Sequence, residues 1–323
     1  MKTKIILFFL VIITVVFTSC QKDTDIFIPN TTVGLDTNWV SATTDQSPIN
    51  QVKKLLAPSV LSDSIDATIG GTLQTSQGLT VIVLPQSLLL GNGQLATGKI
   101  YIETILIKQR GDMILMDKPT TSNGRILISG GEIFIRIRKE NEELHLDPGK
   151  GIYIKYNDAG ASSLMRLFYG DESNAERFNW VQSTSNTQSA IGVTSQGYEL
   201  FCQQLRWINC DYFADTTAGR ITVTASLPAD YTNANTSVYL VFKDLKAVAG
   251  MYGDITTKKF SSSKVPSGKA AIVVSITKKG TNSYYLGHET IITGQTNLNG
   301  IQTVPLSPQP TSLSDIKAYL ATL

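Results

Sequence analysis

Short stretches that alternate between apolar and polar residues recur along the chain from about residue 70 onward. Ile133, Ile135 and Ile137 occupy every second position, so they give one strand an apolar face. The run 220–227 alternates in the same way, with Ile221 and Val223 on one face. Further runs rich in β-branched or aromatic residues are 80–84, 99–107, 126–128, 151–156, 164–169, 178–181, 238–242, 270–277 and 284–293. Strands this short, separated by Gly, Asn, Asp and Pro, predict an all-β protein made of antiparallel β-sandwiches.

Polar, weakly patterned segments divide these runs into two groups. Residues 183–197 are small, polar and almost uncharged, which is typical of a linker between domains. The predicted organisation is a leader at 1–19, a polar tether with a short helix at 20–61, a first sandwich at 62–182, a linker at 183–197, a second sandwich at 198–304, and a Pro-rich connector with a C-terminal helix at 305–323.

Two segments switch to helical signals. Ser47-Pro48 suits the start of a short helix that Pro58 would end. Near the C-terminus, Leu313, Ile316 and Leu320 recur at helical spacing after Ser312, a natural N-cap. This last helix could dock on its own sheet or on a partner protein, and we favour its own sheet.

Gly130-Gly131 separates two strand-like runs, and two adjacent glycines suit either a bulge or a tight turn. Upstream, the segment from Gly70 through Pro85 to Ile100 is similar to the start of ZU5-like domains. Those domains are β-sandwiches that mediate protein–protein contacts and also occur in bacterial surface proteins. The second sandwich is expected to be immunoglobulin-like. The resemblance to ZU5-like domains brings no catalytic residues with it.

The N-terminus has the pattern of an export leader. A short basic start, Met1 to Lys4, precedes an apolar run from Ile5 to Phe17. Thirteen helical residues would span only about 20 Å, which is less than the ~30 Å of a bilayer core, so a membrane-spanning helix is disfavoured. Phe17-Thr18-Ser19-Cys20 ends the run and resembles a bacterial lipobox, although an ordinary secretory leader remains the alternative.

This resemblance implies that Cys20 becomes the acylated first residue of the mature chain. Its acyl chains would then hold the protein on the lipid bilayer. Residues 21–25 are polar and charged and look like the export segment of surface lipoproteins of Bacteroidota, and the segment 112–131 resembles uncharacterised lipoproteins of the same group. We therefore expect an outer-membrane lipoprotein, on the cell surface rather than on the periplasmic face.

The charge balance excludes some classes of partner. The chain carries 28 basic and 26 acidic side chains, and removal of the leader takes away Lys2 and Lys4. The mature protein would be formally neutral, which argues against nucleic acid and against attachment to anionic lipid by charge. The expected partners are the bilayer through Cys20, a protein of the cell envelope and, as an alternative, a glycan.

Candidate catalytic groups are scarce. His145 and His288 are the two histidines, and neither belongs to a serine-triad or zincin motif. We therefore predict no catalytic residue, no metal site and no cofactor.

Cys202 and Cys210 are the cysteines that remain beside the predicted anchor. An exported protein meets oxidising conditions, so a disulfide between them is one expectation. On one continuous strand they would lie roughly 26 Å apart, so the disulfide requires a turn near Gln203-Gln204. Two buried free thiols are the alternative, and the one we favour.

Two other patterns have both a structural and a functional interpretation. The acidic and amide side chains at 157–158 and 171–174 could bind calcium, but ordinary turns explain them. Trp180 and Tyr284-Tyr285 could stack on sugar rings, but core packing explains them as well.

Three functions follow as hypotheses. The first is a lipid-anchored, non-catalytic binding or assembly module. The second is a glycan-binding accessory lipoprotein of a nutrient-uptake system, which exposed aromatic side chains on one sheet face would favour. The third is a hydrolase that uses paired carboxylates, which requires such a pair in a deep pocket.

Overall fold

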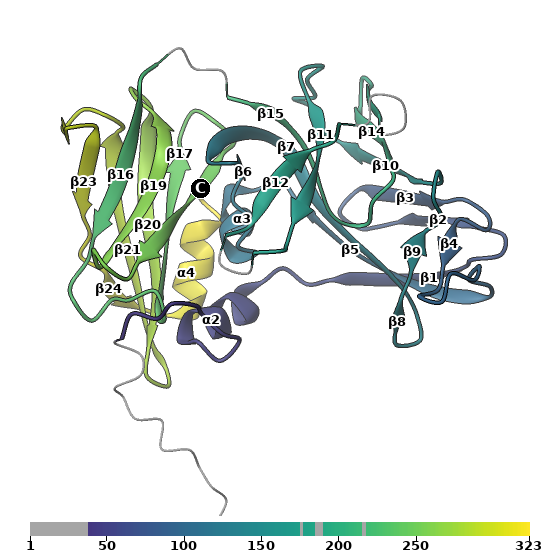
Figure 1. Ribbon diagram of the computed structural model, residues 1–323, viewed down its shortest axis with the longest axis horizontal. Coiled ribbons are helices and arrows are strands. Elements are labelled where there is room, and N and C mark those ends of the chain that lie inside the picture. The colour runs from purple at the N-terminus through teal and green to yellow at the C-terminus, as the bar shows by residue number, and fades with distance from the viewer. Residues whose placement is uncertain (1–37, 175–176, 185–189, 215–217) are drawn as a thin grey trace, which may run out of the picture. The chain divides into compact units, whose positions relative to one another are not determined.

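The computed structural model describes residues 38–323 except 175–176, 185–189 and 215–217. The leader, Cys20 and the tether up to residue 37 lie outside the described residues. The described chain is all-β, with sandwich-like pairs of sheets and a short C-terminal helix, as the alternation predicted (Figure 1). The finer assignments, ZU5-like and immunoglobulin-like, stay predictions.

Sheet 1 is centred on the long strand β7. Its main path runs in the order β1 (Leu61–Asp66), β5 (Lys99–Ile107), β7 (Arg125–Lys139), β15 (Arg206–Phe213), β11 (Arg166–Asp171) and β12 (Asn179–Gln182), and β6 (Thr121–Ser122) and β8 (Glu142–Glu143) also pair with β7. The Gly130-Gly131 step lies inside β7, where the register to β15 shifts opposite Cys210 and Asp211. The two glycines therefore form a bulge and not a turn between strands.

Sheet 2 faces sheet 1. Its order is β13 (Ala190–Val193), β14 (Gly197–Cys202), β10 (Ile152–Asn157), β3 (Leu79–Val83) and β2 (Gly71–Gln74), and the short pair β4 (Leu88–Leu89) and β9 (His145–Leu146) lies apart from it. Ile133, Ile135 and Ile137 are fully buried together with the inward residues Ile152 and Ile154 of sheet 2. This apolar layer is the core of the first sandwich.

The predicted boundary between the domains needs correction. Residues 190–193 of the expected linker form strand β13, and β14 and β15 complete the two sheets of the first sandwich. The second sandwich therefore begins after Phe213 and not at residue 198. The linker prediction failed because a polar, uncharged segment can also be a half-exposed edge strand, and its pairing partner is distant in sequence.

Sheet 3 forms the second sandwich by bending on itself. Its order is β22 (Asn297–Leu298), β23 (Ile301–Pro305), β16 (Arg220–Ser226), β19 (Lys259–Pro266), β18 (Val248–Asp254), β17 (Thr236–Phe242), β20 (Ala270–Lys279), β21 (Ser283–Ile292) and β24 (Gln309–Thr311). The first half of β18 pairs with β17 and its second half pairs with β19. The order β20-β17-β18-β19 is a Greek key. Val223, Leu240 and Val273 lie fully buried between its two layers.

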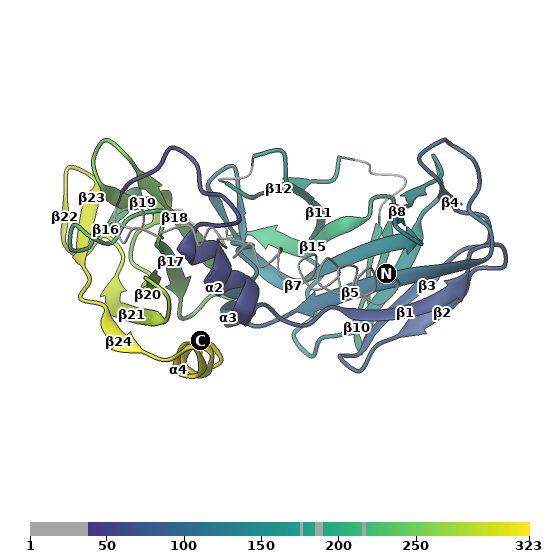
Figure 2. The same cartoon turned by 90° about the horizontal axis from the view of Figure 1, so that it is seen from below.

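A third apolar core joins the two sandwiches. It contains the outer face of sheet 1, the outer face of β17 and β20, and three helices, α2 (Pro48–Leu56), α3 (Arg110–Leu115) and α4 (Leu313–Leu320). Trp180 and Trp207 lie in this shared core, and their rings are 6.5 Å apart. Figures 1 and 2 show α2 and α3 between the strands of sheet 3 and those of sheet 1. Residues 36–323 accordingly form one compact unit.

The two predicted helices are confirmed. Pro48 occupies the first turn of α2, although the Ser47 side chain makes no capping bond. The Ser312 hydroxyl caps α4 by accepting a hydrogen bond from the Asp315 backbone N–H at 3.1 Å. Ile316 and Leu320 are almost fully buried in the shared core, so α4 docks on its own chain, as we favoured.

The contact between α3 and α4 leaves no room for a side chain at Gly111. An added Cβ atom there would lie 2.2 Å from the backbone oxygen of Leu320. We expect Gly111→Ala to displace α4 and to lower the free energy of unfolding by roughly 1–3 kcal/mol in urea denaturation. Gly219→Ala is the matched control, because no atom lies within 4 Å of an added Cβ there. Equal stability of the two variants would contradict the α3–α4 contact.

Candidate functional site

A polar hollow of about 620 Å³ lies at one end of the first sandwich. Its lining residues are Leu146, Asp147, Pro148, Gly149, Lys150, Tyr169, Gly170, Asp171, Val181, Gln182, Ser183, Thr184, Gln203 and Gln204. They come from four separate segments, so the hollow depends on the pairing of the two sheets.

Strand ends and turns position these residues. The turn before β10 is held by two backbone bonds, from Asp147 N–H to Ser87 at 2.9 Å and from Lys150 N–H to Asp147 at 2.8 Å. The end of β12 is tied to β11 by the Ser183 N–H, which donates to the Leu167 carbonyl at 2.8 Å. Backbone hydrogen bonds therefore hold two of the segments that line the hollow.

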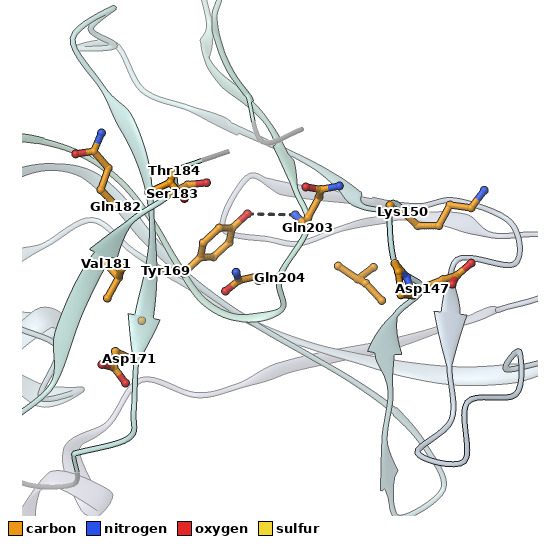
Figure 3. Close-up of a pocket in the computed structure, with 14 residues that line it drawn as sticks. Asp147, Lys150, Tyr169, Asp171, Val181, Gln182, Ser183, Thr184, Gln203 and Gln204 are labelled. Atoms are coloured by element: carbon orange, nitrogen blue, oxygen red, sulfur yellow. Dashed lines mark hydrogen bonds between the residues drawn. The ribbon is translucent and has the colours of Figure 1, made fainter. Parts of the chain in front are cut away.

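Tyr169 forms the floor between the walls. Its side chain is largely buried, and its hydroxyl accepts a hydrogen bond from the Gln203 N–H at 3.1 Å. Figure 3 shows the Tyr169 ring reaching toward Gln203, with Gln182 to Thr184 on one side and Asp147 and Lys150 on the other. The bond fixes the turn between β14 and β15, from which Gln203 and Gln204 line the hollow.

Apart from Tyr169, five of the lining residues carry neutral side chains that both donate and accept hydrogen bonds, beside apolar side chains such as Leu146 and Val181. The side chains of Gln182, Gln203 and Gln204 supply amides, and those of Ser183 and Thr184 supply hydroxyls. The charged groups are two carboxylates and one ammonium, from Asp147, Asp171 and Lys150. This chemistry suits a polar ligand that carries little net charge.

Asp171 is a poor candidate for the acid of an acid–base mechanism. Bonds from the Ser173 side chain and backbone N–H hold the pKa of Asp171 below its usual value, whereas a catalytic acid needs a raised one. In Figure 3 Asp147 and Asp171 lie on opposite sides of the hollow.

Three carboxyl groups elsewhere in the described part of the chain have raised pKa values. Partial burial raises the pKa of Asp112 in α3, which lies outside the hollow. Burial raises the pKa of Glu132 and of Asp211 well above the usual range, and the Asp211 charge raises that of Glu132 further. Both residues are fully buried in sheet 1. Asn209 donates to Asp211 at 2.7 Å, but neither carboxyl oxygen of Glu132 has a hydrogen-bond partner among the described residues. Glu132 and Asp211 have raised pKa values, as a catalytic acid does, but their burial keeps a substrate from reaching them.

A smaller recess of about 300 Å³ surrounds Asp117 between α2 and β17. Lys53 makes an ion pair with Asp117 at 2.8 Å, and the Tyr239 hydroxyl donates to the same carboxylate at 2.6 Å. Burial alone would raise the pKa of Asp117, but the charge of Lys53 and the two bonds outweigh it and lower that pKa. Because these partners satisfy the carboxylate, we assign Asp117 to holding the helix and the strand together.

Cys202 and Cys210, the two candidates for a disulfide, lie on facing sheets. Cys202 ends β14, Cys210 lies in β15, and the turn at Gln203-Gln204 separates them. Both cysteines are buried in the first core, and both thiols are free. The turn that a disulfide required is present, but the two cysteines are buried free thiols, which is the alternative that we favoured.

The remaining candidates lie outside the hollow. His145 is exposed on β9, and His288 stacks on Tyr319 of α4 with ring centres 4.8 Å apart. Trp180 is fully buried, and its indole N–H donates to the Pro119 carbonyl at 3.1 Å. Tyr284 packs against the shared core, so core packing is confirmed for these two aromatic residues.

The acidic stretches form ordinary turns. Asp158 accepts a bond from the Gly160 N–H, and Asp171 accepts one from the Ser173 N–H, each at 2.9 Å. Over the described ranges, acidic, histidine and cysteine side chains nowhere gather into a group that could hold a metal ion. In the same part of the chain no helix has the length and apolarity needed to cross a membrane.

Sequence reasoning did not identify most of the hollow. Gln182, Gln203 and Gln204 follow no periodic pattern. They meet because β11 pairs with β12 on one side and with β15 on the other. The one feature of the sequence that pointed to the hollow is the polar turn residues that flank the short strands.

Comparisons with known proteins do not identify the chain. No protein-family model matches it, and no curated protein matches it. Among solved structures, a gamma-CGTase from the alkalophilic Bacillus clarkii is similar over 75% of this chain at 9% identity, with a TM-score of 0.20. The match spans 40% of that enzyme's length, and a TM-score this low carries no argument about fold or function.

The buried cysteines generate a chemical prediction. Burial raises the pKa of Cys210 to about 12 and that of Cys202 further still, and the thiolate is the reactive form. We expect neither thiol to react with a thiol reagent at pH 8 in the native protein, and both to react in denaturant without reductant. Rapid labelling of the native protein would contradict the packing, and unreactive cysteines in denaturant would indicate a disulfide.

The buried carboxyl groups predict a dependence of stability on pH. Their folded-state pKa values are raised, so above pH 4 the folded state binds more protons than the unfolded state and stability falls as pH rises. Each group contributes at most about 1.4 kcal/mol per pH unit. Glu132→Gln should reduce this slope between pH 5 and 8 in urea denaturation, whereas Glu289→Gln on exposed β21 should not. Equal slopes in the two variants would contradict the assignment.

Proposed function

We propose that this protein is a lipid-anchored, non-catalytic binding module of the outer membrane, and that the polar hollow of the first sandwich is its binding site. The observation that carries the proposal is the lining of the hollow, where three glutamine amides and two hydroxyls converge from separate strand ends. Such groups bind a polar ligand by hydrogen bonds without requiring charge on it.

The distribution of carboxyl groups supports binding rather than catalysis. In the hollow, the pKa of Asp171 is lowered by its bonds from Ser173. Glu132 and Asp211, whose pKa values are raised well above the usual range, are fully buried. Acid–base catalysis needs a group of suitable pKa within reach of the substrate, and Asp112, Glu132 and Asp211, whose pKa values are raised, do not line the hollow.

The lipobox-like sequence that ends at Cys20 supports the location. Acylation there would attach the chain stably, because more than one acyl chain holds a protein on a bilayer. The part of the tether before Trp39, which packs on Phe260, would separate the lipid from the folded unit. We favour display on the cell surface.

The anchor is tested by Cys20→Ser. Without an acylated thiol, the protein should move from the membrane pellet to the aqueous fraction after cell fractionation. Cys202→Ser is the matched control and should stay in the pellet. A Cys20→Ser protein that remains in the pellet would contradict lipid anchoring.

The hollow is tested by photo-crosslinking in intact cells. Gln204→p-benzoylphenylalanine places a photoreactive group in the hollow, and Gln94→p-benzoylphenylalanine places one in an exposed turn away from it. We expect irradiation to attach a ligand to the first variant and not to the second. Adducts at both positions, or at neither, would overturn the assignment of the hollow.

A further inference from the structure

The outer face of sheet 2 presents an exposed aromatic side chain beside the hollow. In β10 the residues alternate strictly, so Ile152, Ile154 and Tyr156 point into the core while Tyr153 and Lys155 point outward. Tyr153 keeps 43% of its surface exposed, which is unusual for an aromatic residue at the centre of a sheet.

Strand register extends this position into two rows across the sheet. The first row is Thr72, Ile82, Tyr153, Phe201 and Ala190, and the second is Gln74, Thr80, Lys155, Glu199 and Gly192. Both rows end on β13 in a residue with little or no side chain, so nothing from that edge strand stands over the aromatic pair. The result is an apolar row bordered by a polar row.

The aromatic pair is held in place. The ring centres of Tyr153 and Phe201 are 5.0 Å apart and the planes are tilted by 45°. Phe201 lies over Gly151, where an added Cβ atom would be 2.6 Å from the ring. The glycine therefore lets the Phe201 ring lie against the backbone and support Tyr153 from one side.

The bordering row carries compensated charge. Lys155 and Glu199 form an ion pair at 2.8 Å, and each side chain is about half exposed. The two groups cancel in net charge but still offer hydrogen-bond donors and acceptors to a neighbour. Charge complementarity therefore excludes a strongly charged occupant and suits a neutral one that is rich in hydroxyls.

The hollow lies just beyond the ends of the two strands that carry Tyr153 and Phe201. Lys150, which lines the hollow, lies three residues before Tyr153, about 10 Å along the strand direction. Gln203 lies two residues after Phe201 on the paired strand. A chain-like ligand bound at the amides of the hollow would therefore pass next to the aromatic pair.

We propose that this face binds a neutral saccharide chain, with the apolar side of a sugar ring stacked on Tyr153 and Phe201 and its hydroxyls bonded to Lys155 and Glu199. The inference rests on the proposed function and names its ligand class. An exposed tyrosine ring, beside an ammonium that donates hydrogen bonds and a carboxylate that accepts them, matches the apolar side and the hydroxyls of a sugar ring.

The test is retention of the full chain, in a detergent without a sugar head group, on gels that contain a soluble polysaccharide. The neutral probes are a β-glucan, a galactomannan and a dextran, and polygalacturonate is the charged probe. We expect retention on at least one neutral probe and none on the charged one. Tyr153→Ala should weaken that binding roughly tenfold, since one central aromatic often dominates such a contact, and Tyr153→Phe should preserve it.

Tyr101→Ala is the matched control. Tyr101 is also an exposed strand tyrosine, at 40%, and it also lies beside a lysine, with Lys99 Nζ 5.0 Å from the ring, but it belongs to sheet 1. Its loss should leave retention unchanged. No retention on any neutral probe, or equal weakening in the two alanine variants, would overturn the saccharide assignment. A crosslinked envelope protein at Gln204 without retention on any gel would leave the binding module standing and remove only the saccharide.

Discussion

The shared apolar core between the two sandwiches is the constraint on which the rest of the structure depends. Sheet 1 has a second apolar face, formed by Phe134, Phe168, Trp180 and Trp207, that its own sandwich cannot cover. The helices α2, α3 and α4 and the outer face of β17 and β20 cover it. Truncation of one such buried aromatic residue typically costs about 3–5 kcal/mol of stability. Separation of the two sandwiches would expose all four aromatic side chains to water, at a larger cost in free energy. The two sandwiches therefore belong to one compact unit, although the sequence predicted two domains.

Polar contacts fix the geometry of this core. The Asp117 carboxylate ties Lys53 of α2 to Tyr239 of β17. Asp117 itself adopts a left-handed backbone conformation, with φ at 54°, which is uncommon for a residue with a side chain and places the carboxylate between its partners. On the other side, Arg110 donates to the backbone carbonyls of Phe242 and Lys243. The shared core covers the outer face of sheet 1. The two proposed binding surfaces, the hollow and the outer face of sheet 2, lie on other parts of the first sandwich.

The sequence predicted the parts of the fold that local periodicity determines. Strict alternation identified the strand at 133–137, and helical spacing after Ser312 identified α4 together with its buried face. The sequence failed where the pairing is long-range. Trp207 and Cys210 follow the expected linker, but β15 inserts between β7 and β11 because its apolar residues fit both faces of sheet 1. The hollow could not be predicted for the same reason, since Gln182 at the end of β12 and Gln203 in the β14–β15 turn have no visible role until the sheets bring them together.

The claim that the described chain is one cooperative unit is tested most directly by scanning calorimetry of the full protein. A unit held by the shared core should unfold in a single transition, with a calorimetric enthalpy equal to the van't Hoff enthalpy. Two resolved transitions, or a calorimetric enthalpy about twice the van't Hoff value, would show that the sandwiches unfold independently and would contradict this account.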